Sequence, residues 1–249
     1  MRGIKALLDA EASKRDSYCE LSLDRPDPLF VAREQDDDRA ILLCALFAYG
    51  SARQIVKLLS SFDFSLLDGG EKVIEGYYKE HYYRFQSKQD MPEIFKAFSR
   101  IEKDELKATL LEGYKKENDM IDAINSMIEL LYKKTSYRSD GCSFLYGKLC
   151  QKSKRKGASP YKRWNMFLRW MVRKDCLDLG RWQEVDRAHL LMPLDTHTFS
   201  ISQKLGLLKR KTYDLESAYL LTQKLKEFDA SDPLKYDFAL YRIGQEGLI

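Results

Sequence analysis

The chain of 249 residues has no long apolar segment. A helix that crosses a membrane needs about 18 to 20 consecutive apolar residues, and no stretch of the sequence approaches that length. The first residues, Met1 to Lys5, also lack the apolar core of a secretory signal peptide. These absences predict a cytoplasmic protein with no membrane association.

Cysteine and histidine are scarce and scattered. The five cysteines stand mostly among apolar residues, as buried free thiols do, and disulfides are rare in a reducing compartment. The three histidines are His81, His189 and His197. Asp195 and His197 together offer only two ligands, whereas a catalytic zinc takes three from the protein. The sequence therefore predicts neither a disulfide nor a bound metal.

Charge is nearly balanced, since 42 Lys and Arg residues face 38 Asp and Glu residues, for a net charge of +4. Such a balance argues only weakly for a nucleic-acid partner. The basic residues, however, gather in three runs, at 152–156, 162–174 and 204–211. Each run is compatible with a solvated face or with phosphate contacts, and the sequence leaves that choice open. Within the first run, residues 153–159 are the best candidate for an exposed loop.

Apolar residues recur at helical spacing, for example over 41–48 and 121–131, and no segment alternates in the manner of a strand. About ten helices are expected, with prolines in first turns and glycines between helices. The separating glycines are Gly50, Gly69, Gly70, Gly113, Gly141, Gly157, Gly180 and Gly206. The acidic run 36–38 fits the start of a helix, where the helix dipole favours negative charge, better than a magnesium site. The fold class is predicted to be all-α.

The segment Pro193 to Phe199 sets one carboxylate at the start of an amphipathic helix. Asp195 is expected to cap that helix by accepting hydrogen bonds from its first amides. The helix should run to Leu205 and end at Gly206 in a left-handed turn. A carboxylate in this position serves as a cap, as a catalytic group, or as both.

The residues 194–201 resemble the Val-Asp-Thr-His motif of the helix-hairpin-helix DNA glycosylase superfamily. Segments 169–175, 178–180, 193–197 and 232–240 are similar to the DUF2400 family, a bacterial branch of that superfamily, and the likeness extends from about residue 24 to 245. It implies two helical lobes with the active site between them, one continuous lobe over 36–185 and one from 1–35 and 186–249. It also implies that Asp195 is catalytic.

Many relatives in that superfamily hold an iron-sulfur cluster with four cysteines that follow the catalytic aspartate. No cysteine follows Cys176 in this chain. The resemblance therefore implies a protein with no iron-sulfur cluster and no other cofactor.

Lys162 is the expected nucleophile. With Ser159 as N-cap and Pro160 at the first helical position, Lys162 falls in a first turn, where the helix dipole disfavours the ammonium form. A neutral amine is what Schiff-base chemistry requires. The spacing from Lys162 to Asp195 also resembles that of the catalytic pair in archaeal 8-oxoguanine glycosylases. Lys174 is the alternative nucleophile.

The resemblance implies further candidates, because residues 48–53 resemble the early turn that contributes to the base pocket in related glycosylases and 176–182 occupies the place of the superfamily hairpin. A flipped base and a DNA backbone also need aromatic surfaces, hydrogen-bond donors and positive charge. Expected substrate-binding residues are Tyr49, Ser51, Trp164, Trp182 and His197. Expected DNA-binding residues are Arg53, Lys156, Arg169, Arg173, Lys174 and Gly180, the last in a hairpin-like segment over 176–182. Core packing is the alternative role for each aromatic residue.

Together these features predict a monomeric DNA glycosylase of base excision repair, with associated β-elimination lyase activity. Its partner would be double-stranded DNA with a damaged base, 8-oxoguanine being the first expectation, and it would associate with the nucleoid when bound. Two alternatives stay open. One is a non-catalytic DNA-binding module on the same scaffold, and the weaker one is a metal-dependent nuclease.

Overall fold

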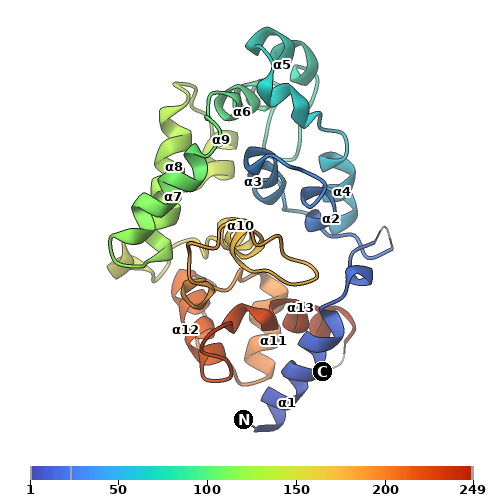
Figure 1. The fold of residues 1–249 in the computed structure, drawn as a ribbon, viewed down its shortest axis with the longest axis vertical. Coiled ribbons are helices and arrows are strands. Elements are labelled where there is room, and N and C mark those ends of the chain that lie inside the picture. The colour runs from blue at the N-terminus through green and yellow to red at the C-terminus, as the bar shows by residue number, and fades with distance from the viewer. Residues whose placement is uncertain (1, 23, 248–249) are drawn as a thin grey trace. The chain divides into compact units, whose positions relative to one another are not determined.

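In a computed structural model that describes residues 2–22 and 24–247, the chain is helical, and these residues form no strand (Figure 1). The all-α prediction is confirmed. The α-helices are α1 (Arg2–Arg15), α2 (Pro28–Ala32), α3 (Asp38–Leu46), α4 (Ala52–Leu59), α5 (Glu71–Tyr78), α6 (Asp90–Ser99), α7 (Glu105–Lys115), α8 (Met120–Lys133), α9 (Asp140–Tyr146), α10 (Lys162–Val172), α11 (Thr196–Lys204), α12 (Leu215–Lys226) and α13 (Asp237–Gln245). Short 3-10 helices are η1 (Tyr18–Glu20), η2 (Phe64–Asp68), η3 (Lys152–Lys154), η4 (Arg187–His189) and η5 (Pro233–Tyr236).

The chain forms two compact units. The terminal unit comprises residues 1–25 and 150–249, and the central unit comprises residues 26–149. The lobes expected from the resemblance divide the chain at 35 and 185. In the structure residues 150–185, and with them α10, group with the two chain ends.

Helix starts follow the local sequence closely. Asp37 caps α3 by accepting a hydrogen bond from the Arg39 amide at 2.8 Å, so the acidic run opens a helix as predicted. Two of the glycines expected between helices instead lie inside them. A Cβ on Gly113, within α7, would lie 2.5 Å from Ser126 Oγ of α8. Gly141, within α9, would meet Asp90 at the same distance. These glycines therefore allow close helix packing, which chain punctuation does not reveal.

Helix α10 belongs to the terminal unit. Its residues from Trp164 to Val172 are all buried, and α11 packs against α13, which also packs against α1 (Figure 1). A helix that is buried on every side normally carries apolar residues throughout. This one carries Arg169, and Arg173 is its C-cap. The carboxylates that balance them come from the loop just after the helix and from a segment far along the chain.

Candidate functional site

Lys162 is the first residue of α10. The expected cap at Ser159 and the expected first helical position at Pro160 are wrong by two residues. Tyr161 stands at the cap in a left-handed conformation, with φ of 53°, and gives no side-chain cap. The Asn165 side chain donates to the Pro160 carbonyl at 3.1 Å, which folds the entry segment back onto the helix. Lys162 nevertheless lies in the first turn, as predicted.

The Lys162 amine has no hydrogen bond and no ion pair within 4.0 Å among residues 2–22 and 24–247. The side chain is half-buried. An amine in that setting is accessible to a small electrophile and is not locked into a salt bridge. This is the state that a lysine nucleophile needs before reaction.

Asp195 caps α11 as predicted, and its Oδ1 accepts a hydrogen bond from the Thr198 amide at 2.7 Å. The helix ends at Lys204 with Leu205 as C-cap, and Gly206 follows in the left-handed conformation, with φ of 69°. The half-buried carboxylate keeps its second oxygen, Oδ2, without a hydrogen-bond partner in the described chain. The cap therefore fixes the Asp195 side chain while one oxygen stays available.

Asp237, the first residue of α13, is a third charged group that is influenced by both Lys162 and Asp195. The charges of both Lys162 and Asp195 act on its buried carboxylate, so the starts of α10, α11 and α13 bring a lysine and two aspartates into one neighbourhood. Burial raises the pKa of Asp237, the nearby Asp195 charge adds to this, and Arg169 and Lys162 oppose it. Asp237 is not among the site residues predicted from the sequence.

Tyr213 flanks the same group. Its hydroxyl donates to the Leu194 carbonyl at 2.9 Å, directly before Asp195. Burial, with the Asp195 charge, raises the pKa of Tyr213 to about 12. The phenol therefore stays protonated near neutral pH and remains a hydrogen-bond donor.

Arg169 of α10 and Arg173, which is the C-cap of that helix, are buried, with exposed fractions of 4% and 7%. Arg169 binds Asp178, at 3.2 Å from Nε, and Asp237. Arg173 binds Asp178 and Asp232, the latter at 2.8 Å from Nε. The expected positive face for DNA is therefore corrected. Both guanidinium groups are neutralised by carboxylates and hold the terminal unit together.

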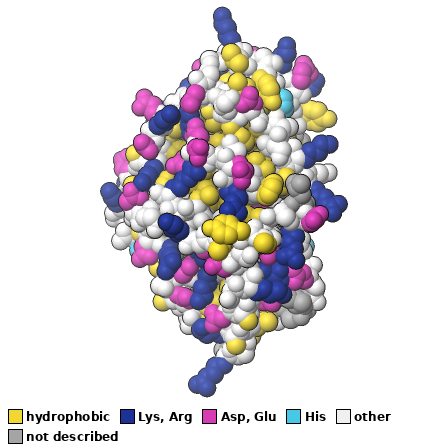
Figure 2. Space-filling view, turned by 45° about the vertical axis from the view of Figure 1, so that its right-hand side comes forward, with side chains coloured by type: hydrophobic (Ala, Val, Ile, Leu, Met, Phe, Trp, Pro, Cys, Tyr) yellow, Lys and Arg dark blue, Asp and Glu magenta, His cyan; other side chains and the backbone are white. Residues whose placement is uncertain are grey.

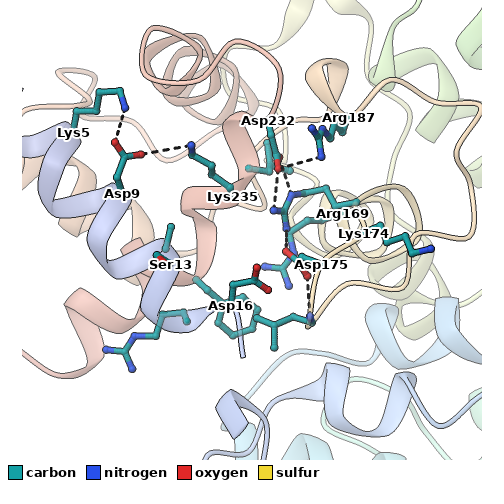
Figure 3. A pocket seen from close by; sticks show the side chains of 16 residues that line it. Lys5, Asp9, Ser13, Asp16, Arg169, Lys174, Asp175, Arg187, Asp232 and Lys235 are labelled. Atoms are coloured by element: carbon teal, nitrogen blue, oxygen red, sulfur yellow. Dashed lines mark hydrogen bonds and ion pairs between the residues drawn. The ribbon is translucent and has the colours of Figure 1, made fainter. Parts of the chain in front are cut away.

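A cavity of about 580 Å³ lies beside these arginines, between α1, the loop after α10 and η5 (Figure 3). Its charged lining is mixed. Asp9 binds Lys5 and Lys235, and Asp232 lies 3.8 Å from Arg187. Cationic side chains outnumber acidic ones in the lining of this cavity, seven to four, although most of the cations are already paired with carboxylates.

The segment expected to be a DNA-binding hairpin, 176–182, folds back onto the end of α10. The amide of Gly180 donates to the Trp170 carbonyl at 3.2 Å, and that of Trp182 to the Met171 carbonyl at 2.8 Å. The expected phosphate contact through the Gly180 amide is thus replaced by an internal hydrogen bond. Lys174, at the start of this loop, is exposed and makes no ion pair in the described part of the chain.

Substituting Gly180 with alanine should destabilise the protein more than the same change at Gly206. Both glycines are left-handed, with φ of 63° and 69°. A Cβ at Gly180 would lie 2.5 Å from the Lys174 Cβ, whereas none of the described atoms comes within 4 Å at Gly206. We expect Gly206→Ala to cost about 1 kcal/mol and Gly180→Ala about 2 to 3 kcal/mol. Urea denaturation of both variants measures the difference, and equal losses would contradict the steric argument.

The basic loop, residues 152–159, directly precedes Lys162 and is largely exposed, as predicted. It is anchored to the start of α12. The Gly157 amide donates to Asp214 at 2.8 Å, and Arg155 pairs with Glu216 at 2.7 Å. Lys156 is exposed at the tip. Across the face shown in Figure 2, Lys and Arg side chains are interspersed with Asp and Glu side chains. Overall charge therefore does not single out this loop, and its interest lies in its position just before Lys162 in the chain.

Asp214 stabilises the basic loop, and Asp214→Asn should release it. Burial raises the pKa of Asp214, but hydrogen bonds from Arg210 and from the Gly157 and Ser217 amides lower it by a larger amount. The net result is a pKa of about 2, below the ordinary value of 3.8. A depressed carboxylate pKa contributes stability above its usual value of 3.8, and this stability is lost as pH falls toward 2. We expect the variant to lose about 1 to 3 kcal/mol at pH 7 and progressively less below pH 4.

Two measurements test this prediction. Urea denaturation from pH 7 to pH 3 should show the gap between wild type and Asp214→Asn closing as the solution becomes acidic. Limited trypsin digestion at pH 7 should cut the variant faster within residues 152–156, where lysines and an arginine gather. A gap that stays constant with pH would contradict the assigned ionic contribution of Asp214.

The two tryptophans expected to bind a base are part of the core. Trp182 has an exposed fraction of 1% and packs edge-on against Phe167, with ring centroids 5.2 Å apart. Trp164 is also buried. This corrects the expected stacking role, because neither indole face is open to a ligand. His197 is exposed in the first turn of α11.

Tyr49, Ser51 and Arg53 belong to the central unit. Ser51 is exposed and caps α4, and Arg53 is exposed on the same helix. The half-buried Tyr49 ring lies 4.9 Å from Phe144 and 6.0 Å from Phe85, and its hydroxyl donates to Gln86. These three rings form the aromatic cluster of the central unit.

The aromatic cluster reaches the surface. Phe85 has an exposed fraction of 55%, and the Arg84 guanidinium lies 5.9 Å from its ring centroid. Arg84 has a left-handed φ of 52°. Exposed aromatic rings beside a cation are common where proteins stack on nucleic-acid bases. Of these three rings, only Tyr49 is among the site residues predicted from the sequence.

Over residues 2–22 and 24–247, no three His, Cys, Asp or Glu side chains are grouped so as to hold a metal ion. In the same residues, no helix is long and apolar enough to span a membrane. The five cysteines are all free thiols.

Over the described residues, fold and site define a helical, two-unit protein in which Lys162, Asp195 and Asp237 lie at the starts of three helices, and the charges of the first two act on the third. The profile of the family described as "Protein of unknown function (DUF2400)" matches residues 27–246, so the chain belongs to the DUF2400 family. No curated protein and no solved structure matches the chain.

Proposed function

We propose that the protein is a DNA glycosylase with associated lyase activity, acting on a damaged base that has been flipped out of double-stranded DNA. One observation carries the proposal. The amine of Lys162 is unpaired, and it follows an exposed basic loop. Its charge and that of the half-buried Asp195 both act on the same buried carboxylate, Asp237. The resemblance of the Asp195 motif to the helix-hairpin-helix glycosylases supports the same assignment.

The chemistry follows from these groups. Lys162 attacks the anomeric carbon of the flipped nucleotide as the bond from sugar to base breaks. Asp195 offsets the positive charge that develops on the sugar, through the oxygen that the helix cap leaves without a partner. The imine that forms then permits strand cleavage by β-elimination. Because charge stabilisation acts mainly in the transition state, Asp195 contributes to the rate more than to DNA affinity.

DNA contacts in this proposal come from residues that the structure leaves exposed. Lys156 and its neighbours in the basic loop offer charge to the backbone next to Lys162. The aromatic cluster of the central unit, with Arg84, offers a surface on which a base can stack. Oxidised guanine remains the first substrate to test.

The test is borohydride trapping. The purified protein is incubated with duplexes that contain 8-oxoguanine, an abasic site or no lesion, and reduction converts an imine into a covalent band of protein and DNA. A band on the 8-oxoguanine duplex supports a bifunctional glycosylase, and a band on the abasic duplex alone supports a lyase that acts on another lesion. DNA binding without a band on either lesion contradicts the proposed Schiff-base mechanism and leaves the non-catalytic module.

Asp195→Asn is the matched variant. Asn caps helices about as well as Asp, so the α11 start is retained while the charge is removed. We expect trapping on the 8-oxoguanine duplex to slow by about a hundredfold or more, with DNA affinity within about twofold of wild type.

A further inference from the structure

The basic run 204–211 lies beside the basic loop, although the two are far apart in the sequence. The Gly157 amide of the loop donates to Asp214 Oδ2 at 2.8 Å, across 57 residues of chain. The guanidinium of Arg210, in the run, donates to both oxygens of the same carboxylate. Asp214 therefore joins two basic segments of the terminal unit.

The arginines of these two segments are used inside the protein. Arg155 pairs with Glu216 at 2.7 Å, and its guanidinium lies 4.1 Å from the centroid of the Tyr219 ring. Arg210 pairs with Asp214, whose side chain is only 1% exposed. These pairs neutralise the two carboxylates that anchor the segments, so neither carboxylate remains to balance the lysines.

The lysines of the same segments point to a partner outside the chain. Lys154, Lys156, Lys209 and Lys211 are all exposed. In the chain as far as the structure describes it, none of these four side chains makes an ion pair or a hydrogen bond. Like charges that are held close together repel each other. This group, the lysine surface, therefore favours a partner that carries several negative charges.

A hollow of about 550 Å³ lies within the run 204–211, and no carboxylate is among its lining residues, Gln203, Gly206, Leu208, Lys209 and Lys211. Gln203 supports it by donating to the Arg210 carbonyl at 2.8 Å. Gly206 adds no side chain to the space. The cavity in Figure 3, by contrast, has aspartates in its lining. An anionic group that enters the hollow meets cations without competing carboxylates.

The lysine surface is connected with both groups that are proposed to act on the sugar. Tyr213 follows the run and donates to the carbonyl of Leu194, the residue before Asp195, at 2.9 Å. The basic loop leads along the chain into Lys162. Duplex DNA carries one negative charge for about every 1.7 Å of its axis. A nucleotide bound at Asp195 therefore brings a series of phosphates with it.

We propose that the lysine surface binds phosphates of the DNA backbone that flank the nucleotide at Asp195, and that one phosphate occupies the hollow at Lys209 and Lys211. This inference rests on the proposed function and assigns DNA contacts to a run whose role the sequence left open. Backbone contacts do not depend on base sequence, so the surface should bind a duplex with or without a lesion.

The double variant Lys209→Gln/Lys211→Gln tests the surface without any chemistry at a lesion. Fluorescence anisotropy with a lesion-free duplex gives the affinity at several salt concentrations. Each lost phosphate contact removes about 0.9 from the slope of log affinity against log salt, so the slope should become shallower by about 2. At about 50 mM salt the affinity should fall by about tenfold or more. Lys154→Gln/Lys156→Gln should act in the same direction.

Lys72→Gln/Lys79→Gln is the matched control. Both lysines are exposed, on α5 and at its C-cap, and neither has a partner among the described residues. The control removes the same charge from the central unit and should keep its affinity within about twofold of wild type. All three double variants replace exposed side chains without partners, so we expect each to unfold close to wild type.

An unchanged salt slope in Lys209→Gln/Lys211→Gln would overturn the proposal. An equal loss in the control would do the same, because it would show an effect of net charge rather than of a surface. Sedimentation with vesicles of phosphatidylglycerol and phosphatidylcholine tests a membrane as the partner. Loss of vesicle binding in the variant, with duplex binding unchanged, would assign the lysines to a lipid surface and refute the inference.

Failure of the proposed function is distinguishable, because anisotropy does not depend on base removal. If the wild type traps no lesion duplex but the variant shows the shallower slope, the lysine surface is supported and the Schiff-base mechanism is contradicted. If the wild type traps a lesion duplex and the slope of the variant is unchanged, only the lysine surface is refuted.

Discussion

Lys162→Gln should abolish the covalent band on every lesion duplex, with a loss of about a thousandfold or more in the trapping rate. The reason is chemical, since an amide cannot form an imine with the sugar. The fold should be preserved, because Lys162 is half-buried and makes no hydrogen bond or ion pair in the part of the chain that the structure describes. Denaturing gel electrophoresis after borohydride reduction, at matched protein and DNA concentrations, measures the effect.

Lys174→Gln is the control for that experiment. Lys174 is exposed, belongs to the same unit and was the alternative nucleophile. It should trap DNA at close to the wild-type rate. A band that persists in Lys162→Gln and disappears in Lys174→Gln would assign the nucleophile to Lys174. Loss of the band in both would point to a shared effect on DNA binding, which a filter-binding assay with the unmodified duplex detects.

Arg173→Met should destabilise the terminal unit by about 3 to 5 kcal/mol. The variant leaves Asp178 and Asp232 buried without the guanidinium that binds both. Methionine fills much of the space but offers no donor, so Asp178 keeps only Arg169 and Asp232 keeps only the half-exposed Arg187 as a cationic partner. Thermal unfolding followed by circular dichroism should show a melting temperature about 10 °C lower.

Arg187→Met provides the comparison. Arg187 lies 3.8 Å from the same Asp232, but half of its side chain, 49%, is exposed. Exposed ion pairs contribute about 0 to 1 kcal/mol, so this variant should unfold close to wild type. Equal losses in the two variants would contradict the view that burial makes the Arg173 network decisive.

Several features of the site could be predicted because they depend on a few neighbouring residues. The Asp195 cap uses an amide three residues away, and the end of α11 depends on the left-handed Gly206. The exposed character of residues 153–159 follows from their small and basic side chains. Such features are governed by local backbone geometry and solvation, which are the same wherever the segment stands in a fold.

Arg169 and Arg173 show where reasoning from neighbouring residues fails. On a helix considered alone, Arg169 and Arg173 share a face with Lys162 and predict a basic surface. Their partners Asp237 and Asp232 lie 68 and 59 residues further along the chain. Both segments, 169–175 and 232–240, are similar to the DUF2400 family. However, no spacing within either segment shows that Asp232 and Asp237 of the second bind Arg173 and Arg169 of the first.

By itself the sequence determined the helical class, the cap at Asp195 and the place of Lys162 in a first helical turn, because periodicity and capping act over a few residues. Tertiary structure alone decided which charged side chains are paired in buried ion pairs and which stay unpaired. It buried Arg169, Arg173, Trp164 and Trp182, and it placed Asp237 where the charge of Lys162 acts on it. Burial and long-range pairing depend on how distant segments pack, and the free energy of a charge depends on that packing more than on its neighbours in sequence.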